Sequence, residues 1–278
     1  MPSIDSHVTE VETRQAIHDR GITEVAIYAV IADVLDPELD EPLVKLGFID
    51  RVLVDGSDVT VIFKLPTYWC APNFAYLMAS DLRKKMRTVP GVRIARVALL
   101  DHCAEEEVTN AVNQGQSFSE AFPDEAPEDE HLEELRRTFL RKGFLMRQDA
   151  LLRQMLKVGL DEATISALHM ADMTIDEPTN VAFISVHEQV VRLEGVGRSA
   201  AVYLSRRTSL GLPQAPDDPL ITDDQGQPLQ PGGLKEFLRR SRSIRMNIMF
   251  NTSMCKGLFR TRYENAGASE AYPEGESI

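Results

Sequence analysis

The sequence has few cysteines, a single tryptophan and no hydrophobic run long enough to span a bilayer. Three cysteines in 278 residues do not make a disulfide framework, so we expect reduced thiols in a cytosol-like compartment. The longest apolar stretch, VAIYAVIADVL, is too short for a transmembrane helix and contains Asp33. The first residues, MPSIDSHVTEVETRQ, have no apolar core, which predicts no signal peptide. We therefore expect a soluble, cytoplasmic protein.

Basic residues are also in short supply. The chain has 30 Lys and Arg against 43 Asp and Glu, a formal net charge of −13. Binding to nucleic acid or to an anionic membrane needs a basic surface, so we expect neither partner. The sequence contains no P-loop and no Gly-x-Gly-x-x-Gly, the usual signals of a nucleotide site. It also lacks the two Glu-x-x-His motifs of a carboxylate-bridged diiron site, since Glu128–His131 has no second copy.

The first structured segment is an apolar helix followed by an acidic loop. Residues 22–35 are apolar on most sides, and Thr23 is placed to cap the start of a helix. Pro37 cannot continue that helix and pushes Asp36 toward an extended conformation. Asp36, Glu38, Asp40 and Glu41 are therefore expected in a loop.

A hairpin, a helix and a third strand come next. Asp55-Gly56 lies between two β-branched runs and predicts a hairpin turn. A helix then begins near Pro72, and the strand VRIARVALLD follows it. The helical crossover makes the second and third strands parallel neighbours. The fold class expected is α+β or α/β: a small α-β-β-α-β domain with a mixed sheet, then a mostly helical second domain.

An acidic stretch separates the two halves. Residues 104–134 contain acids and prolines but no Lys or Arg, which predicts a partly disordered linker. Helical periodicity predicts that the second half is mostly helical, with a break at Gly143 and a possible hairpin within residues 180–193. The domains expected are an N-terminal extension 1–19, an α/β domain 20–112, an acidic linker 113–130, a mostly helical domain 131–264 and a disordered tail 265–278.

The stretch LPTYWCAPNF holds the most informative thiol, Cys70. It lies between Pro66, where a strand ends, and Pro72, where a helix starts. The positive end of a helix favours thiolate over thiol, and thiolate is the form that binds iron, zinc or a cluster. The alternative is a buried cysteine that acts as a small hydrophobic side chain.

These motifs together resemble the small metal–sulfur cluster assembly family, which includes PaaD-like and SufT-like proteins. The residues that match are Asp36, Pro37, Glu38, Leu46, Gly47, Ile49 and Cys70, within roughly residues 20–110. The chain differs from the family pattern around the cysteine, where Pro66, Tyr68 and Ala71 replace its residues. In its two-part build the chain is also similar to accessory proteins of soluble diiron monooxygenases.

The resemblance implies an accessory protein of iron–sulfur cluster or iron-centre assembly rather than an enzyme. Its cargo is a transient Fe–S cluster or iron bound at Cys70, and its partners are assembly proteins or a client metalloenzyme, with a diiron monooxygenase as one option. A single cysteine is not enough for a cluster. The further metal ligands that we consider are Asp36, Glu38, His102 and Cys103, or a second chain in a homodimer.

A geometric argument supports this ligand set. If the second and third strands are parallel, Cys70 and the His102-Cys103 pair both follow strand ends at one edge of the sheet, the usual ligand-bearing edge. Taken singly, His102 also fits a surface residue and Cys103 a buried cap.

Two other functions remain open. The first is a metal-free adaptor that binds a metalloenzyme client through the same fold. The second is a cysteine-dependent enzyme using Cys70, His102 and Asp101, although no hydrolase signature surrounds Cys70. Cys255 has no second thiol near it in the sequence and is interpreted as a core residue.

Overall fold

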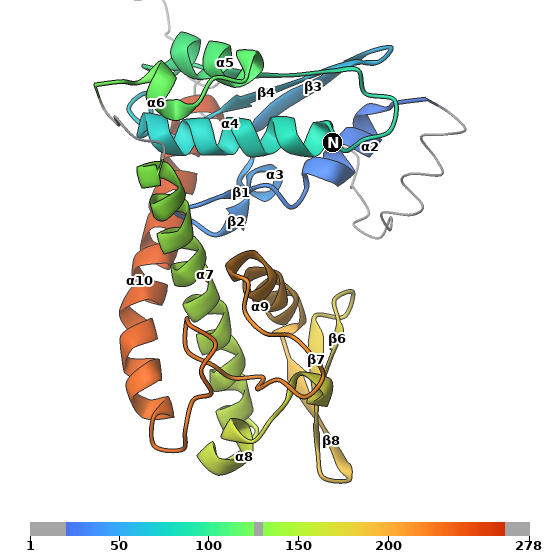
Figure 1. Ribbon diagram of the computed structural model, residues 1–278, viewed down its shortest axis with the longest axis vertical. Helices are drawn as coiled ribbons and strands as arrows, with labels where there is room; N and C mark the ends of the chain where they lie inside the picture. Colours follow the sequence, from blue (N-terminus) through green and yellow to red (C-terminus); the bar gives the residue numbers. More distant parts are fainter. Residues whose placement is uncertain (1–20, 125–129, 265–278) are drawn as a thin grey trace, which may run out of the picture. The chain divides into compact units, whose positions relative to one another are not determined.

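The computed structural model describes residues 21–124 and 130–264, and these form two compact units (Figure 1). The first unit contains the described residues up to Glu133 together with those from Met249 onward, and the second unit is Glu134–Ile248. The predicted extension 1–19 and tail 265–278 lie outside the described residues. In the described part of the chain, no helix is long and apolar enough to cross a membrane.

The first unit follows the predicted order of a helix, a hairpin, a helix and a strand, with a few short additions. Its elements are α2 (Glu24–Ile31), β1 (Leu35–Asp36), β2 (Glu41–Pro42), α3 (Leu43–Leu46), β3 (Ile49–Asp55), β4 (Asp58–Lys64), α4 (Pro72–Met86), β5 (Ile94–Leu100), α5 (Glu105–Gln114) and α6 (Phe118–Ala121). Thr23 caps α2 as predicted, since its hydroxyl accepts a hydrogen bond from the Ala26 amide at 3.2 Å.

The mixed three-stranded sheet is confirmed. β3 and β4 pair antiparallel through the turn at Gly56, where φ is +56°. β4 and β5 pair parallel, with Lys64 opposite Leu100 at their carboxyl ends. Helix α4 supplies the crossover between them, and α4 and α5 pack on β5 and on each other (Figure 1). The sheet therefore presents the ends of β4 and β5 at one edge.

The prediction of a partly disordered acidic linker is wrong for residues 105–122. Helices α5 and α6 occupy this stretch, and Phe118 and Phe122 are buried in the core of the first unit. Three glutamates lie in the first turn of α5. Their negative charges stabilise the helix because its N-terminal end carries partial positive charge. Ser117 and Glu120 form a capping box that starts α6. Residues 125–129 lie outside the described part.

The second unit is mostly helical, as predicted, and also has a small antiparallel sheet. Its elements are the main part of α7 (Glu130–Lys157), α8 (Glu162–Ser166), the short 3₁₀ turn η1 (Met170–Asp172), β6 (Met173–Asp176), β7 (Val181–Val186), β8 (Gln189–Glu194), α9 (Gly197–Leu210) and the first part of α10 (Leu234–Phe259). The β7–β8 hairpin was expected, and β6 adds a third strand that was not. The predicted break at Gly143 is wrong, because α7 runs through it.

Helix α9 starts with a glycine because its backbone approaches β7 closely. A Cβ on Gly197 would lie 2.5 Å from the Val181 nitrogen, which leaves no room for a side chain. The GVGRS stretch is thus a helix start, and the close approach explains its second glycine.

The core of the second unit includes a buried charge. The Asp149 carboxylate is fully buried on α7 and lies 2.8 Å from Arg153 Nε and 3.1 Å from Arg245 Nε. Ser241 on α10 donates a hydrogen bond to it at 2.8 Å. The carboxylate therefore links α7 to α10 within this unit.

Candidate functional site

The acidic loop is a tight turn organised by Asp36. The Asp36 carboxylate accepts hydrogen bonds from the Glu38 and Leu39 amides at 2.9 and 3.0 Å. Pro37, between Asp36 and Glu38, has no amide hydrogen to offer. Asp40 closes the turn with φ at +53°, and β1 pairs with β2 on either side. The Asp-Pro-Glu motif thus buries Asp36 and leaves the Glu38 side chain half-buried.

Burial makes the Asp36 carboxyl a weak acid. Loss of solvent raises its pKa to about 6, and nearby Glu38 adds to the shift, while the two amide hydrogen bonds oppose it. At neutral pH the buried Asp36 carboxyl is charged, and this charge costs folding free energy. Groups with a pKa perturbed by burial are frequent at functional sites, where function and stability compete.

We expect Asp36→Asn to stabilise the chain at neutral pH. The pKa is 3.8 without burial and about 6 in the folded state, so the folded chain binds the extra proton and its stability falls as pH rises through this range. Asparagine keeps the accepting oxygen and removes the charge, for a gain of about 1–3 kcal/mol above pH 7. Urea unfolding at pH 4.5 and pH 7.5 measures it.

The control for this variant is Asp55→Asn, in the exposed hairpin turn. It should keep the wild-type pH profile. Parallel profiles for wild type and Asp36→Asn would contradict the assignment of the buried charge to Asp36.

The Cys70 loop is fastened to the end of β5 by two hydrogen bonds. The Cys103 amide donates to the Tyr68 carbonyl at 2.9 Å. His102 Nε2 contacts the Cys70 carbonyl oxygen at 2.7 Å. Asp101, with φ at +58°, turns the chain at the end of β5 so that His102 reaches back. The parallel β4–β5 pair thus brings Cys70 and His102-Cys103 together at the predicted edge.

His102 acts here through both ring nitrogens. Its Nδ1 accepts the Ala104 amide at 3.1 Å, so the neutral ring carries its proton on Nε2 and donates it to the Cys70 carbonyl. Burial lowers its pKa, which favours the neutral form. In this arrangement His102 positions the Cys70 backbone. The contact that a Cys-His nucleophile needs would run to the thiol instead.

The Cys70 thiol is half-buried just before α4. Burial raises its pKa to about 12, and the charges of Asp36, Cys255 and Glu38 add to the shift. Burial and the neighbouring acids therefore act against the thiolate that the start of α4 was expected to favour. The thiol is protonated and unreactive until a cation replaces its proton.

Two aromatic side chains precede Cys70 without covering it. Trp69 is 77% exposed and Tyr68 is 44% exposed. Their rings meet edge to face with centroids 4.7 Å apart. They therefore form a small apolar surface facing solvent.

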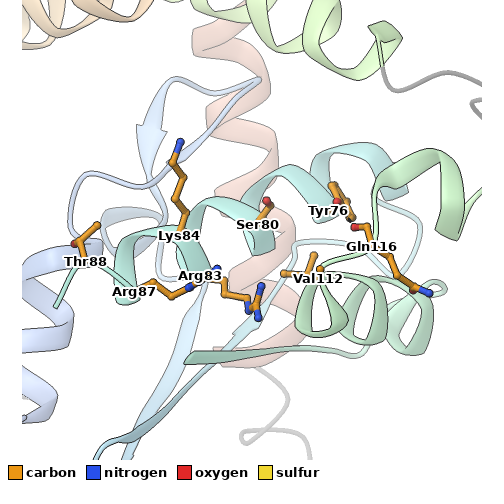
Figure 2. Close-up of a pocket in the computed structure, with 9 residues that line it drawn as sticks. Tyr76, Ser80, Arg83, Lys84, Arg87, Thr88, Val112 and Gln116 are labelled. Atoms are coloured by element: carbon orange, nitrogen blue, oxygen red, sulfur yellow. Dashed lines mark hydrogen bonds between the residues drawn. The ribbon is translucent and has the colours of Figure 1, made fainter. Parts of the chain in front are cut away.

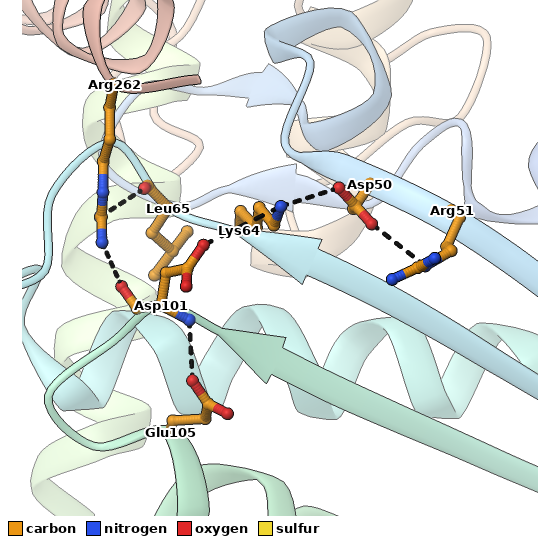
Figure 3. Close-up of polar contacts among 7 residues, drawn as sticks. All are labelled: Asp50, Arg51, Lys64, Leu65, Asp101, Glu105 and Arg262. Carbon is orange, nitrogen blue, oxygen red and sulfur yellow. Dashed lines mark hydrogen bonds and ion pairs between the residues drawn. The ribbon is translucent and has the colours of Figure 1, made fainter. Parts of the chain in front are cut away.

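The last turns of α10 and the π turn η2 (Arg260–Glu264) complete this edge of the first unit. Arg262 donates hydrogen bonds to the carbonyl oxygens of Leu65 at 3.3 Å and Asp101 at 2.6 Å, which joins the ends of β4 and β5 (Figure 3). Lys64 lies between Asp50 and Asp101 in the same row of charges (Figure 3). The C-terminal segment is thereby held at the strand ends that carry the Cys70 loop.

Cys255 on α10 is the residue that sequence reasoning missed. The sequence indicated a core position, and Cys255 does pack, half-buried, against the core of the first unit. It is also close enough to Cys70, Asp36 and Glu38 for their charges to interact. Burial raises its pKa to about 11, and Asp36 and Glu38 add to the shift. Its sequence neighbourhood gives no signal of this, because the contact depends on how α10 folds back onto the first unit.

The predicted ligands do not form a complete cluster site. Within the described residues, no group of three His, Cys, Asp or Glu side chains is arranged to hold a metal ion. Cys70 and Cys255 are near the two acids of the turn, His102 uses both nitrogens, and the Cys103 side chain is exposed. Ordinary iron–sulfur clusters take four ligands, and within the described residues these donors do not come together to supply them.

A separate groove of about 440 Å³ lies between α4 and the end of α5 (Figure 2). Its lining residues are Tyr76, Ser80, Arg83, Lys84, Arg87, Thr88, Val112, Gly115 and Gln116. None of them is a cysteine, histidine or carboxylate. The groove therefore has no part in the site around Cys70.

One comparison with known proteins bears on a segment of the first unit. Residues 24–99 match the family model described as iron-sulfur cluster assembly protein, which confirms the resemblance stated from the sequence. No curated protein and no solved structure matches the chain. The matched segment runs from α2 to the end of β5 and contains the Asp36 turn and Cys70 but not Cys255.

Proposed function

We propose that the chain is a maturation factor that carries iron or an iron–sulfur cluster as cargo and passes it to a client metalloenzyme. The observation that carries this proposal is the placement of the Cys70 thiol, beside the Asp36 turn and at the carboxyl edge of β4 and β5, within a segment that matches the assembly family. Residues 24–99 support a role in Fe–S cluster assembly, and the delivery step is our inference.

The incomplete ligand set supports transfer over storage. A cargo held by fewer than four protein ligands keeps open coordination positions, which a client, an assembly protein or a second copy of the chain can fill. Neutral thiols add to this, because protonation of the released sulfur favours departure of the metal. The client that we propose for testing is a soluble diiron monooxygenase, and the expected compartment is the cytoplasm.

The test is anaerobic reconstitution of the full chain with iron and sulfide. We expect the wild-type protein to retain iron and to show visible sulfur-to-iron absorption, and Cys70→Ser to lose both. Cys103→Ser is the matched control, since its thiol is exposed and the hydrogen bond to the loop comes from its backbone amide. Absence of bound iron in the wild-type chain, with client maturation unharmed by Cys70→Ser, would contradict the proposal.

A metal-free adaptor is the second candidate, and the exposed Trp69-Tyr68 pair favours it. An aromatic side chain that is 77% exposed beside the site is typical of a residue that binds a partner protein. Under this function, Trp69→Ala would weaken capture of the client while Cys70→Ser left it intact. The proposed carrier requires Cys70 for iron content, so the same two variants separate the functions.

A further inference from the structure

The C-terminal segment presents one continuous face to the first unit. Asn251, Cys255, Phe259 and Arg262 are spaced so that they lie on the same side of the helix and the π turn that follows. Three of them have defined partners in the first unit, and these partners locate the fourth, Cys255.

The contacts on either side of Cys255 fix its position. One turn before it, Asn251 Nδ2 donates a hydrogen bond to Glu38 Oε1 at 3.1 Å. One turn after it, the Phe259 ring lies 5.1 Å from that of Phe48, centroid to centroid. The segment therefore runs along the Asp36 turn, with Cys255 directly after the turn that holds Glu38.

The Cys70 loop meets the same face. Arg262 contacts Leu65, where the loop begins, and Asp101, which is followed by the histidine that holds the Cys70 carbonyl. Cys70 and Cys255 both pack, half-buried, against one hydrophobic core. Two thiols that are far apart in the sequence are thus close enough to each other and to Glu38 for their charges to interact.

We propose that Cys255 is the second thiol ligand of the Cys70 site, so that the C-terminal segment and the Cys70 loop together bind one thiophilic metal ion. This inference rests on the proposed function, because it names a ligand of the same cargo site.

The binding step is balanced without any redox partner. Each thiol exchanges its proton for a bond to the metal, and the two protons go to solvent. No electrons move, and the ion keeps its oxidation state. Soft sulfur ligands of this kind suit Fe²⁺, Zn²⁺ or Cu⁺.

Cobalt titration of the reduced full-length chain, without oxygen, tests the inference. The near-ultraviolet thiolate-to-Co²⁺ absorption grows with the number of thiolate bonds. We therefore expect Cys255→Ser, at saturating cobalt, to halve the absorption per bound ion. Cys103→Ser should equal the wild type. An unchanged band in Cys255→Ser would overturn the inference.

The same titration separates this inference from the proposed function. If Cys70→Ser removes the band and Cys255→Ser leaves it at full strength, the carrier function stands and the second ligand is wrong. If the wild-type chain shows no band at all, both are wrong.

A second measurement avoids any variant that could fold poorly. In the wild-type chain, Zn²⁺ should protect Cys70 and Cys255 together from alkylation, while Cys103 continues to react at its original rate. Peptide mass spectrometry gives the three rates. Equal alkylation of Cys255 with and without zinc would also overturn the inference.

Discussion

The affinity of the chain for a thiophilic divalent cation is expected to rise about 100-fold for each unit of pH between about pH 6.5 and 8. The free thiols of Cys70 and Cys255 have pKa values of about 12 and about 11, so both are protonated across this range. Each thiol that binds metal releases one proton. Two released protons give a slope of two in the logarithm of the affinity against pH.

The direction of the effect follows from competition between the metal and the proton. Raising pH removes protons from solution and favours the metal-bound form, so the affinity increases. Asp36 has a pKa of about 6 and is charged throughout most of the window. Below about pH 6 its protonation would add a further released proton and steepen the slope.

Competition with a chromophoric zinc chelator at several pH values measures this slope, after correction for the chelator's own protonation. Cys255→Ser should lower the slope to one, a tenfold change per unit of pH. Cys103→Ser should leave it at two. An affinity independent of pH would show that neither thiol gives up a proton on binding.

The second large effect is expected in the other unit. Asp149→Ala should lower the free energy of unfolding of the second unit by about 3–5 kcal/mol, the range for a buried ion pair that loses one partner. The Asp149 side chain is fully buried, whereas those of Arg153 and Arg245 retain 43% and 27% exposure. Removal of the carboxylate takes away the ion pair that Arg245 makes with it and the shorter, 2.8 Å hydrogen bond of the Ser241 hydroxyl.

Urea unfolding followed by far-ultraviolet circular dichroism measures the loss. Asp149→Asn, which keeps the shape and loses the charge, should fall between wild type and alanine. Glu236→Ala is the control, because it removes an exposed partner of Arg239 on α10 and should change stability little. Equal effects from the buried and the exposed carboxylate would contradict the role of Asp149.

Much of the first unit could be predicted because its signals are local. The turn signal Asp55-Gly56 lies directly between the two strands, β3 and β4, that form the antiparallel hairpin. The helix between β4 and β5 returns the chain to the same end of the sheet, which favours a parallel pair and needs no tertiary detail. The edge at which Cys70 meets His102 follows from that topology. The capping box of Ser117 and Glu120 is also a local signal, and it indicates the start of α6. We missed this helix because the acidic composition around it predicted a linker.

Other features of the site depend on contacts between distant parts of the chain. Cys255 and Arg262 reach the Cys70 edge only because the last turns of α10 pack on the first unit, and helical periodicity alone does not specify that partner. The pKa of Cys70 could not be predicted either. That pKa depends on how deeply the thiol is buried and on the charge of Asp36. The sequence indicates neither of these, and shows only that a helix starts just after Cys70.

The exposed position of Trp69 gives the chain a built-in optical probe. It is the only tryptophan in 278 residues and is next to Cys70, so all indole fluorescence originates beside the candidate site. A ring that is mostly in water emits at long wavelength, and contact with an apolar surface shifts that emission to shorter wavelength. Arrival of a client at this edge can therefore be followed by intrinsic emission, without attaching a dye near the thiols.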